Sequence, residues 1–126
     1  MSKNLKALVV DDSLLSRRMI KDQLSANGFS EIFEAANGYE AVEKFKKNSP
    51  DFVTMDIVMP DKDGLETLKE IMDIDPDAKV VMISSIGQEH YISASKRLGA
   101  KTHIVKPITS ESIKKGIAEV FPSDKC

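Results

Sequence analysis

Strand-like and helix-like patterns alternate five times along this chain of 126 residues, and no other feature of the sequence restricts the fold as strongly. Short apolar runs bounded by turn residues predict strands over residues 6–10, 31–35, 52–55, 79–83 and 102–105. Apolar residues at helical spacing predict helices over about 13–27, 38–48, 63–72, 88–98 and 110–121. Such alternation over short connections favours right-handed βαβ units and a parallel sheet with helices on both faces.

The first predicted helix follows the first strand directly. Asp12 or Ser13 can cap its start, and Asn27-Gly28 is a stop signal. The apolar face that its spacing predicts consists of Leu15, Met19, Ile20 and Leu24. We expect this face to pack on the sheet.

Length and composition favour a single domain of residues 1–126 with its core in about 4–121, and we expect no output domain. The net charge of -2 gives no general reason to bind nucleic acid or an anionic membrane. No apolar run approaches the roughly 20 residues of a membrane span, and residues 1–6 lack the apolar part of a signal peptide. Because the single cysteine, Cys126, excludes an internal disulfide, we expect a cytoplasmic protein without membrane insertion.

Polar side chains stand where the predicted strands end. Asp11 and Asp12 follow the first strand, Asp56 the third, Ser84 the fourth and Lys106 the fifth. Carboxyl ends of parallel strands meet at one edge of the sheet, so these groups should share one pocket. Two like charges about 4 Å apart repel by roughly 4 kcal/mol at an effective dielectric of 20, which calls for a cation beyond the single lysine. Mg²⁺ fits best because it prefers oxygen ligands. No histidine or cysteine stands at these strand ends, which argues against zinc.

Each of these residues also has a plain structural interpretation. Asp11-Asp12 can cap a helix, Asp56 can be a turn residue, and Ser84 can cap the next helix. Lys106-Pro107 alone is an ordinary loop dipeptide. Their shared position at the ends of successive apolar runs favours a functional site over a set of unrelated caps and turns.

Five motifs make the chain similar to the receiver domain of the two-component response regulators. They are VVDD at 9–12, MDIVMPDKDG at 55–64, MISS at 82–85, GAK at 99–101 and VKP at 105–107. The resemblance covers about residues 4–121 and implies a flavodoxin-like, doubly wound α/β fold with five helices and five parallel strands in the order 2-1-3-4-5. In size the chain is most similar to the stand-alone receivers of chemotaxis. The resemblance therefore implies two-component signal transduction, with flagellar motor control as the favoured output.

The resemblance also implies a phosphoacceptor and a metal site. Asp56 would take a phosphoryl group from a phosphohistidine, or from a small donor such as acetyl phosphate, and form an acyl phosphate. Asp11, Asp12 and Asp56 would bind Mg²⁺, with the backbone carbonyl of Val58 as a further ligand. The chain would catalyse only its own phosphorylation and slow dephosphorylation, and would not be an enzyme that turns over a metabolite.

Other residues would support the transfer. Lys106 would neutralise charge on the transferring oxygens, and Ser84 would donate its hydroxyl to a phosphoryl oxygen. Gly64 would allow the loop after Asp56 to turn tightly. The Lys106-Pro107 peptide bond would be cis.

The sequence departs from the usual receiver pattern at two places. His103 stands where receivers usually carry the Tyr or Phe that moves on activation; it could act as the switch, titrate near neutral pH, or simply be exposed. Val58 and Ile86 stand at the positions that influence the water attacking the phosphoryl group. Neither side chain can hydrogen-bond a water, so we expect slow self-dephosphorylation and a separate phosphatase.

The resemblance implies a partner-binding face over the fourth helix, the fifth strand and the last helix. The face would include Tyr91, Lys96, Lys101, His103, Lys114 and Lys115. Its lysines suit an acidic helix or peptide, although they are also typical of a solvated surface. The implied partners are a CheA-like histidine kinase, a flagellar motor switch protein and a phosphatase. We expect a monomer, with dimers as an alternative after phosphorylation.

Three other functions compete with this interpretation. A phosphorelay intermediate would pass the phosphoryl group on to a histidine phosphotransferase. A phosphohydrolase with an aspartyl nucleophile needs a second Asp two residues later, where this chain has Val58. A flavodoxin-like electron carrier would meet repulsion between Asp11-Asp12 and its flavin phosphate, and the chain has no Trp for stacking.

Overall fold

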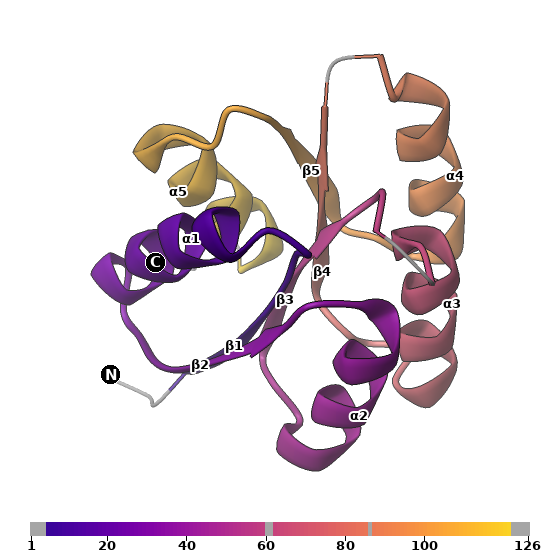
Figure 1. Cartoon of the computed structure of the whole chain (residues 1–126), viewed down its shortest axis with the longest axis horizontal. Coiled ribbons are helices and arrows are strands. Elements are labelled where there is room, and N and C mark those ends of the chain that lie inside the picture. Colours follow the sequence, from indigo (N-terminus) through magenta and orange to yellow (C-terminus); the bar gives the residue numbers. More distant parts are fainter. Residues whose placement is uncertain (1–4, 60–61, 86, 122–126) are drawn as a thin grey trace.

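The computed structural model describes residues 5–59, 62–85 and 87–121. One parallel sheet has the strand order β2-β1-β3-β4-β5, which confirms the predicted doubly wound α/β class. The strands are β1 (Leu5–Val10), β2 (Phe29–Ala35), β3 (Phe52–Asp56), β4 (Val80–Ser84) and β5 (Thr102–Val105). The helices are α1 (Leu14–Ala26), α2 (Gly38–Asn48), α3 (Gly64–Ile74), α4 (Glu89–Leu98) and α5 (Ser110–Val120). Helices α1 and α5 cover one face of the sheet, and α2, α3 and α4 cover the other (Figure 1).

Apolar runs form the central strands because both faces of the sheet are covered. In β1, Ala7 and Val9 pack toward α1 and α5, whereas Leu8 and Val10 pack toward α2 and α3. All four side chains are almost fully buried. The central strands therefore hold two separate cores together and fix the position of the residues that follow them.

Side-chain caps start four of the five helices shortly after the strands end. The hydroxyl of Ser13 accepts a hydrogen bond from the Ser16 N–H at the start of α1. Asn37, Asp63 and Thr109 cap α2, α3 and α5 in the same way. A cap satisfies a backbone N–H that the first helical turn leaves without a partner. The chain can thus turn sharply at the carboxyl edge of the sheet.

The predicted apolar face of α1 is wrong in two of its four residues. Ile20 and Leu24 are buried, but Leu15 is 71% exposed and Met19 is 46% exposed. The inward stripe of α1 continues from Leu24 and Ile20 to Arg17, one helical turn nearer the start of the helix. A charged residue occupies the inward position there, so the apolar spacing alone points to the wrong phase.

Several strand boundaries also differ from the prediction by one or two residues. Strand β2 begins at Phe29, two residues earlier than expected, because Phe29 pairs with Leu5 and packs against the ring of Phe52 at 5.3 Å between centroids. Strand β4 includes Ser84, which pairs with Val105.

Within the described residues, every helix is too short or too polar to cross a membrane.

Candidate functional site

Three carboxylates meet at the carboxyl edge of the sheet, as the strand ends predict. Val10 pairs with Met55, so the next residues along these two strands, Asp11 and Asp56, leave the sheet side by side. Ligand oxygens of Asp11, Asp12 and Asp56 lie within 4.8 Å of one another. Asp11 is fully buried and Asp56 is only 7% exposed, whereas Asp12 is exposed. These residues form an acidic cluster, here called the acidic pocket, with two buried carboxylates and one exposed carboxylate.

Lys106 joins this group from the end of β5. Its Nζ lies 3.6 Å from Asp56 Oδ2 and 3.9 Å from Asp11 Oδ2. The Lys106 N–H donates to the Ser84 carbonyl at 2.7 Å, which continues the pairing of β4 and β5 beyond Val105. The peptide bond between Lys106 and Pro107 is cis. One ammonium group therefore faces two buried carboxylates.

The electrostatics of the pocket favour a further cation. Burial, and then the charge of Asp11, raise the pKa of Asp56 to about 6, although Lys106 opposes the rise. Burial also raises the pKa of Asp11, against a hydrogen bond from the Ser13 N–H and the charge of Lys106. A divalent ion would favour the ionised form of both groups.

Two buried polar atoms in the pocket lack a partner among the described residues. Asp11 Oδ1 accepts from the Ser13 N–H at 2.9 Å, but Asp11 Oδ2 accepts no hydrogen bond. The hydroxyl of Ser84 is also buried without a hydrogen bond. A buried polar atom of this kind calls for a ligand. An unsatisfied carboxylate oxygen beside two more carboxylates fits an oxygen-preferring cation such as Mg²⁺, and the hydroxyl fits an oxyanion.

The loop after Asp56 approaches its own strand closely. The Gly64 N–H donates to the Ile57 carbonyl at 2.7 Å. A Cβ at Gly64 would lie 2.2 Å from the Asp56 carbonyl oxygen, so no larger residue fits without a shift of the loop. Gly64 is thus required by close contact and not by a positive φ. Val58 in this loop is 55% exposed, and Ile86 lies outside the described residues.

The predicted partner face contains exposed residues on both sides of the edge strand β5. Tyr91 on α4 is 37% exposed, and the predicted lysines Lys96, Lys101, Lys114 and Lys115 are exposed too. His103 is half-buried, and its Nδ1 has no hydrogen-bond partner in the part of the chain that the structure describes. His103 and Lys115 line one hollow of about 270 Å³ between β5 and α5. The structure therefore brings these two residues together.

Sequence reasoning missed Arg17. This residue lies on the inward side of α1, and its Nη1 donates to the backbone carbonyl of Asp11 at 2.7 Å. Its Nε donates to Glu34 of β2 at 3.1 Å. Only one sequence signal points to Arg17. It is a charged residue one helical turn before Ile20, on a face that is otherwise buried.

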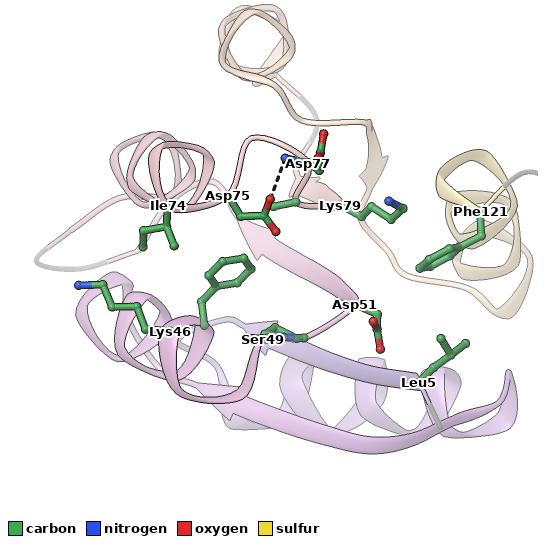
Figure 2. A pocket seen from close by; sticks show the side chains of 12 residues that line it. Leu5, Lys46, Ser49, Asp51, Ile74, Asp75, Asp77, Lys79 and Phe121 are labelled. Carbon is green, nitrogen blue, oxygen red and sulfur yellow. Dashed lines mark hydrogen bonds between the residues drawn. The ribbon is translucent and has the colours of Figure 1, made fainter. Parts of the chain in front are cut away.

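A second hollow lies at the opposite edge of the sheet, where β1, β3 and β4 begin (Figure 2). It has a volume of about 820 Å³ and contains none of the predicted site residues. The backbone N–H of Lys6 donates to Asp51, and that of Asp77 donates to Asp75, each at 2.9 Å. Backbone N–H groups thus satisfy part of the hydrogen-bonding capacity of the carboxylates in this hollow. No described side-chain oxygen there is buried without a hydrogen bond, as Asp11 Oδ2 is.

The fold and the acidic cluster define a doubly wound α/β domain with three carboxylates and one lysine at the carboxyl edge of its sheet. Comparison with known families makes this class more specific. The model of the response regulator receiver domain matches residues 7–118. The chain belongs to this family and is a two-component signalling protein.

Individual relatives agree with the family. The chain is 47% identical to the chemotaxis protein CheY of Bacillus subtilis (strain 168) over 112 residues, covering 89% of this chain and 93% of that protein. It is 34% identical to the sporulation initiation phosphotransferase F of the same organism over 119 residues, covering 94% and 95%. Among solved structures, a chain of the CheX-CheY-BeF3-Mg²⁺ complex from Borrelia burgdorferi matches with a TM-score of 0.88 and 39% identity, covering 93% of this chain and 89% of that chain.

Proposed function

We propose that Asp56 is the phosphoacceptor of a Mg²⁺-dependent receiver. The single observation that carries this proposal is the cluster of Asp11, Asp12 and Asp56, with Lys106 beside Asp11 and Asp56. A phosphoacceptor must remain ionised to attack phosphorus, and it must lie beside groups that neutralise the oxygens being transferred. The pocket meets both needs once a divalent cation is bound.

The chain's own residues support the transfer as follows. A carboxylate oxygen of Asp56 attacks phosphorus, and the bond from phosphorus to the donor nitrogen breaks. The donor imidazole keeps the electron pair and takes a proton from solvent. Lys106 lies 3.6 Å from Asp56 Oδ2 and can neutralise a phosphoryl oxygen without a large movement. Ser84 donates its unpartnered hydroxyl to the same group after transfer.

The proposed metal ligands are Asp11, Asp12, Asp56 and the backbone carbonyl of Val58. When bound, Mg²⁺ would offset the repulsion among the carboxylates and the negative charge of the phosphoryl group. The unpartnered Asp11 Oδ2 supports this assignment because its only ion-pair partner within 4 Å, among the described residues, is Lys106 at 3.9 Å. The structure of a relative solved with Mg²⁺ and BeF3 is consistent with it.

The phosphoryl group should be long-lived without a partner. Val58 is 55% exposed beside Asp56 and offers no hydrogen bond to an attacking water. Ile86, which we propose for the second position, lies outside the described residues. Slow self-dephosphorylation would make the signal depend on a separate phosphatase. A solved relative forms a complex with a second protein, CheX.

We place the protein in chemotaxis, with a CheA-like histidine kinase as donor and a flagellar motor switch protein as target. Identities of 41–47% to several CheY proteins support this output. We place the protein in the cytoplasm, because two-component kinases use cytoplasmic ATP. We also propose that it is a monomer. A phosphorelay role is the second candidate, and the 34% identity to sporulation initiation phosphotransferase F favours it.

A transfer assay tests the donor directly. A CheA-type kinase is autophosphorylated with radiolabelled ATP, freed of nucleotide, and mixed with wild type or Asp56→Asn in Mg²⁺. We expect the label to move to the wild type and to stay on the kinase with Asp56→Asn. Transfer onward to a histidine phosphotransferase would favour the phosphorelay role, and label on Asp56→Asn would overturn the assignment of Asp56.

A further inference from the structure

Arg17 joins three parts of the molecule beside the proposed metal site. Its side chain is 14% exposed and reaches from α1 to the carboxyl ends of two strands. Nη1 donates to the backbone carbonyl of Asp11 at 2.7 Å, and Nε donates to Glu34 Oε1 at 3.1 Å. The planar guanidinium group makes both hydrogen bonds at once, which a lysine cannot do with the same geometry.

Glu34 is a firm anchor for Arg17. The ammonium of Lys21 lies 3.4 Å from Glu34 Oε2, so both carboxylate oxygens have a cationic partner. Burial alone would raise the pKa of Glu34, but the hydrogen bonds from Arg17 and Lys21 lower it below the usual value. The backbone carbonyl of Glu34 also accepts a hydrogen bond from Lys44 of α2. Glu34 is thus held from both faces of the sheet.

These bonds act on the turn that carries Asp11 and Asp12. The Asp11 N–H donates to the Ala35 carbonyl, and Asp11 Oδ1 accepts from the Ser13 N–H. The Asp11 carbonyl accepts from Arg17, which leaves Oδ2 as the free oxygen of the residue. We propose that Arg17, anchored on Glu34, is a positioning residue that holds the Asp11-Asp12 turn in the geometry needed for a divalent cation. This inference rests on the proposed Mg²⁺ site.

Charge and geometry make opposite predictions for this residue. Arg17 is a cation beside a cation site, so its removal should tighten Mg²⁺ binding if only its charge matters. If it positions Asp11, its removal should weaken Mg²⁺ binding, because outer-shell partners of metal ligands are typically worth about 10–100-fold in affinity. The sign of the change therefore separates the two effects.

The test is isothermal titration of Mg²⁺ into the full chain. We expect Arg17→Met to bind Mg²⁺ about tenfold more weakly than the wild type. Arg18→Met is the matched control, since Arg18 is the next residue, has the same charge and is exposed. It should bind Mg²⁺ as well as the wild type or slightly better. In phosphorylation by acetyl phosphate, Arg17→Met should need more Mg²⁺ for half-maximal rate but reach a similar maximum.

Arg17→Lys keeps the charge but not the paired hydrogen bonds, and it should also bind Mg²⁺ several-fold more weakly. It supplies the answer if Arg17→Met fails to fold. Unchanged or tighter binding by the folded Arg17 variants would overturn the positioning role. Asp11→Asn and Asp12→Asn are measured in parallel. If the wild type does not bind Mg²⁺, or if these two variants bind it normally, the proposed metal site itself is wrong.

Discussion

The carboxylate of Asp56 is unfavourable for the stability of the metal-free protein. Burial and the neighbouring Asp11 raise its pKa to about 6, although an ordinary Asp has a pKa of 3.8. At neutral pH the folded protein therefore holds an ionised group that the unfolded chain would solvate better. A buried, poorly compensated charge is expected at a functional site, where chemistry takes precedence over stability.

Asp56→Asn should therefore stabilise the metal-free protein at neutral pH. A raised pKa means that stability is greatest below the unfolded pKa near 4 and falls as the pH rises through about 6. We expect the variant to exceed the wild type by about 2–3 kcal/mol in unfolding free energy at pH 7.5, and by almost nothing below pH 4. Urea unfolding with a chelator measures this difference. Asp22→Asn, at an exposed site on α1, is the control, and a pH-independent difference would contradict the account.

Val58 should control the lifetime of the acyl phosphate. In Val58→Asn, an amide replaces the exposed isopropyl group beside Asp56 and can hydrogen-bond the attacking water. We expect phosphoryl loss to accelerate about twofold to tenfold, the rate equivalent of one hydrogen bond. Decay of the isolated phosphoprotein, followed after removal of donor, measures the rate. Val58→Leu is the apolar control, and equal rates for all three proteins would refute the proposed role.

The elements could be predicted from the sequence more accurately than their orientations. Apolar runs located all five strands, most clearly the central strands β3 and β4, which are buried on both faces. Helix α1 shows the limit, because its inward stripe includes Arg17 while Leu15 and Met19 face outward. Apolar periodicity cannot detect an inward charge whose partners, the Asp11 carbonyl and Glu34, are known only after folding. The positioning residue was therefore missed for the same physical reason that the helix phase was wrong.

Substitutions on α1 should separate its two sides. Leu24→Ala removes a fully buried side chain and should cost about 2–5 kcal/mol of unfolding free energy. Leu15→Ser and Met19→Ser change exposed residues and should each stay within about 1 kcal/mol of the wild type, including the lower helix propensity of serine. Chemical denaturation compares the three variants. A loss above 2 kcal/mol for either serine variant would mean that α1 packs with its predicted face inward.

At the scale of the whole molecule, the parallel topology brings Asp11, Asp56, Ser84 and Lys106 together. These residues could be predicted because strand order does not alter which edge a strand end reaches. The network around Glu34 could not, since it depends on which helix crosses which strand. The proposed partner face lies beside the edge strand β5, where His103 and Lys115 line one hollow. The proposed phosphorylation site includes Lys106, the residue that follows β5, so the two proposed sites share this strand.

The lysines of α5 should contribute to partner binding. A combined Lys114→Glu and Lys115→Glu variant reverses two exposed charges on α5, and Lys115 shares a hollow with His103. The variant should weaken binding of an acidic partner helix by about tenfold or more, with a strong dependence on salt. Pull-down and titration with the phosphorylated protein measure the effect. Lys69→Glu on α3 is the control for charge alone. Normal binding by the double variant would remove α5 from the partner face.

The measurement that tests the central claim most directly is the intact mass of the protein after treatment with acetyl phosphate, with and without Mg²⁺. We predict one added phosphoryl group in the wild type, dependent on Mg²⁺, and none in Asp56→Asn. Folding of the variant is checked by its circular dichroism spectrum, so that a missing group reports on chemistry alone. Phosphorylation of Asp56→Asn, or equal phosphorylation of the wild type without Mg²⁺, would contradict the assignment of Asp56 and its metal site.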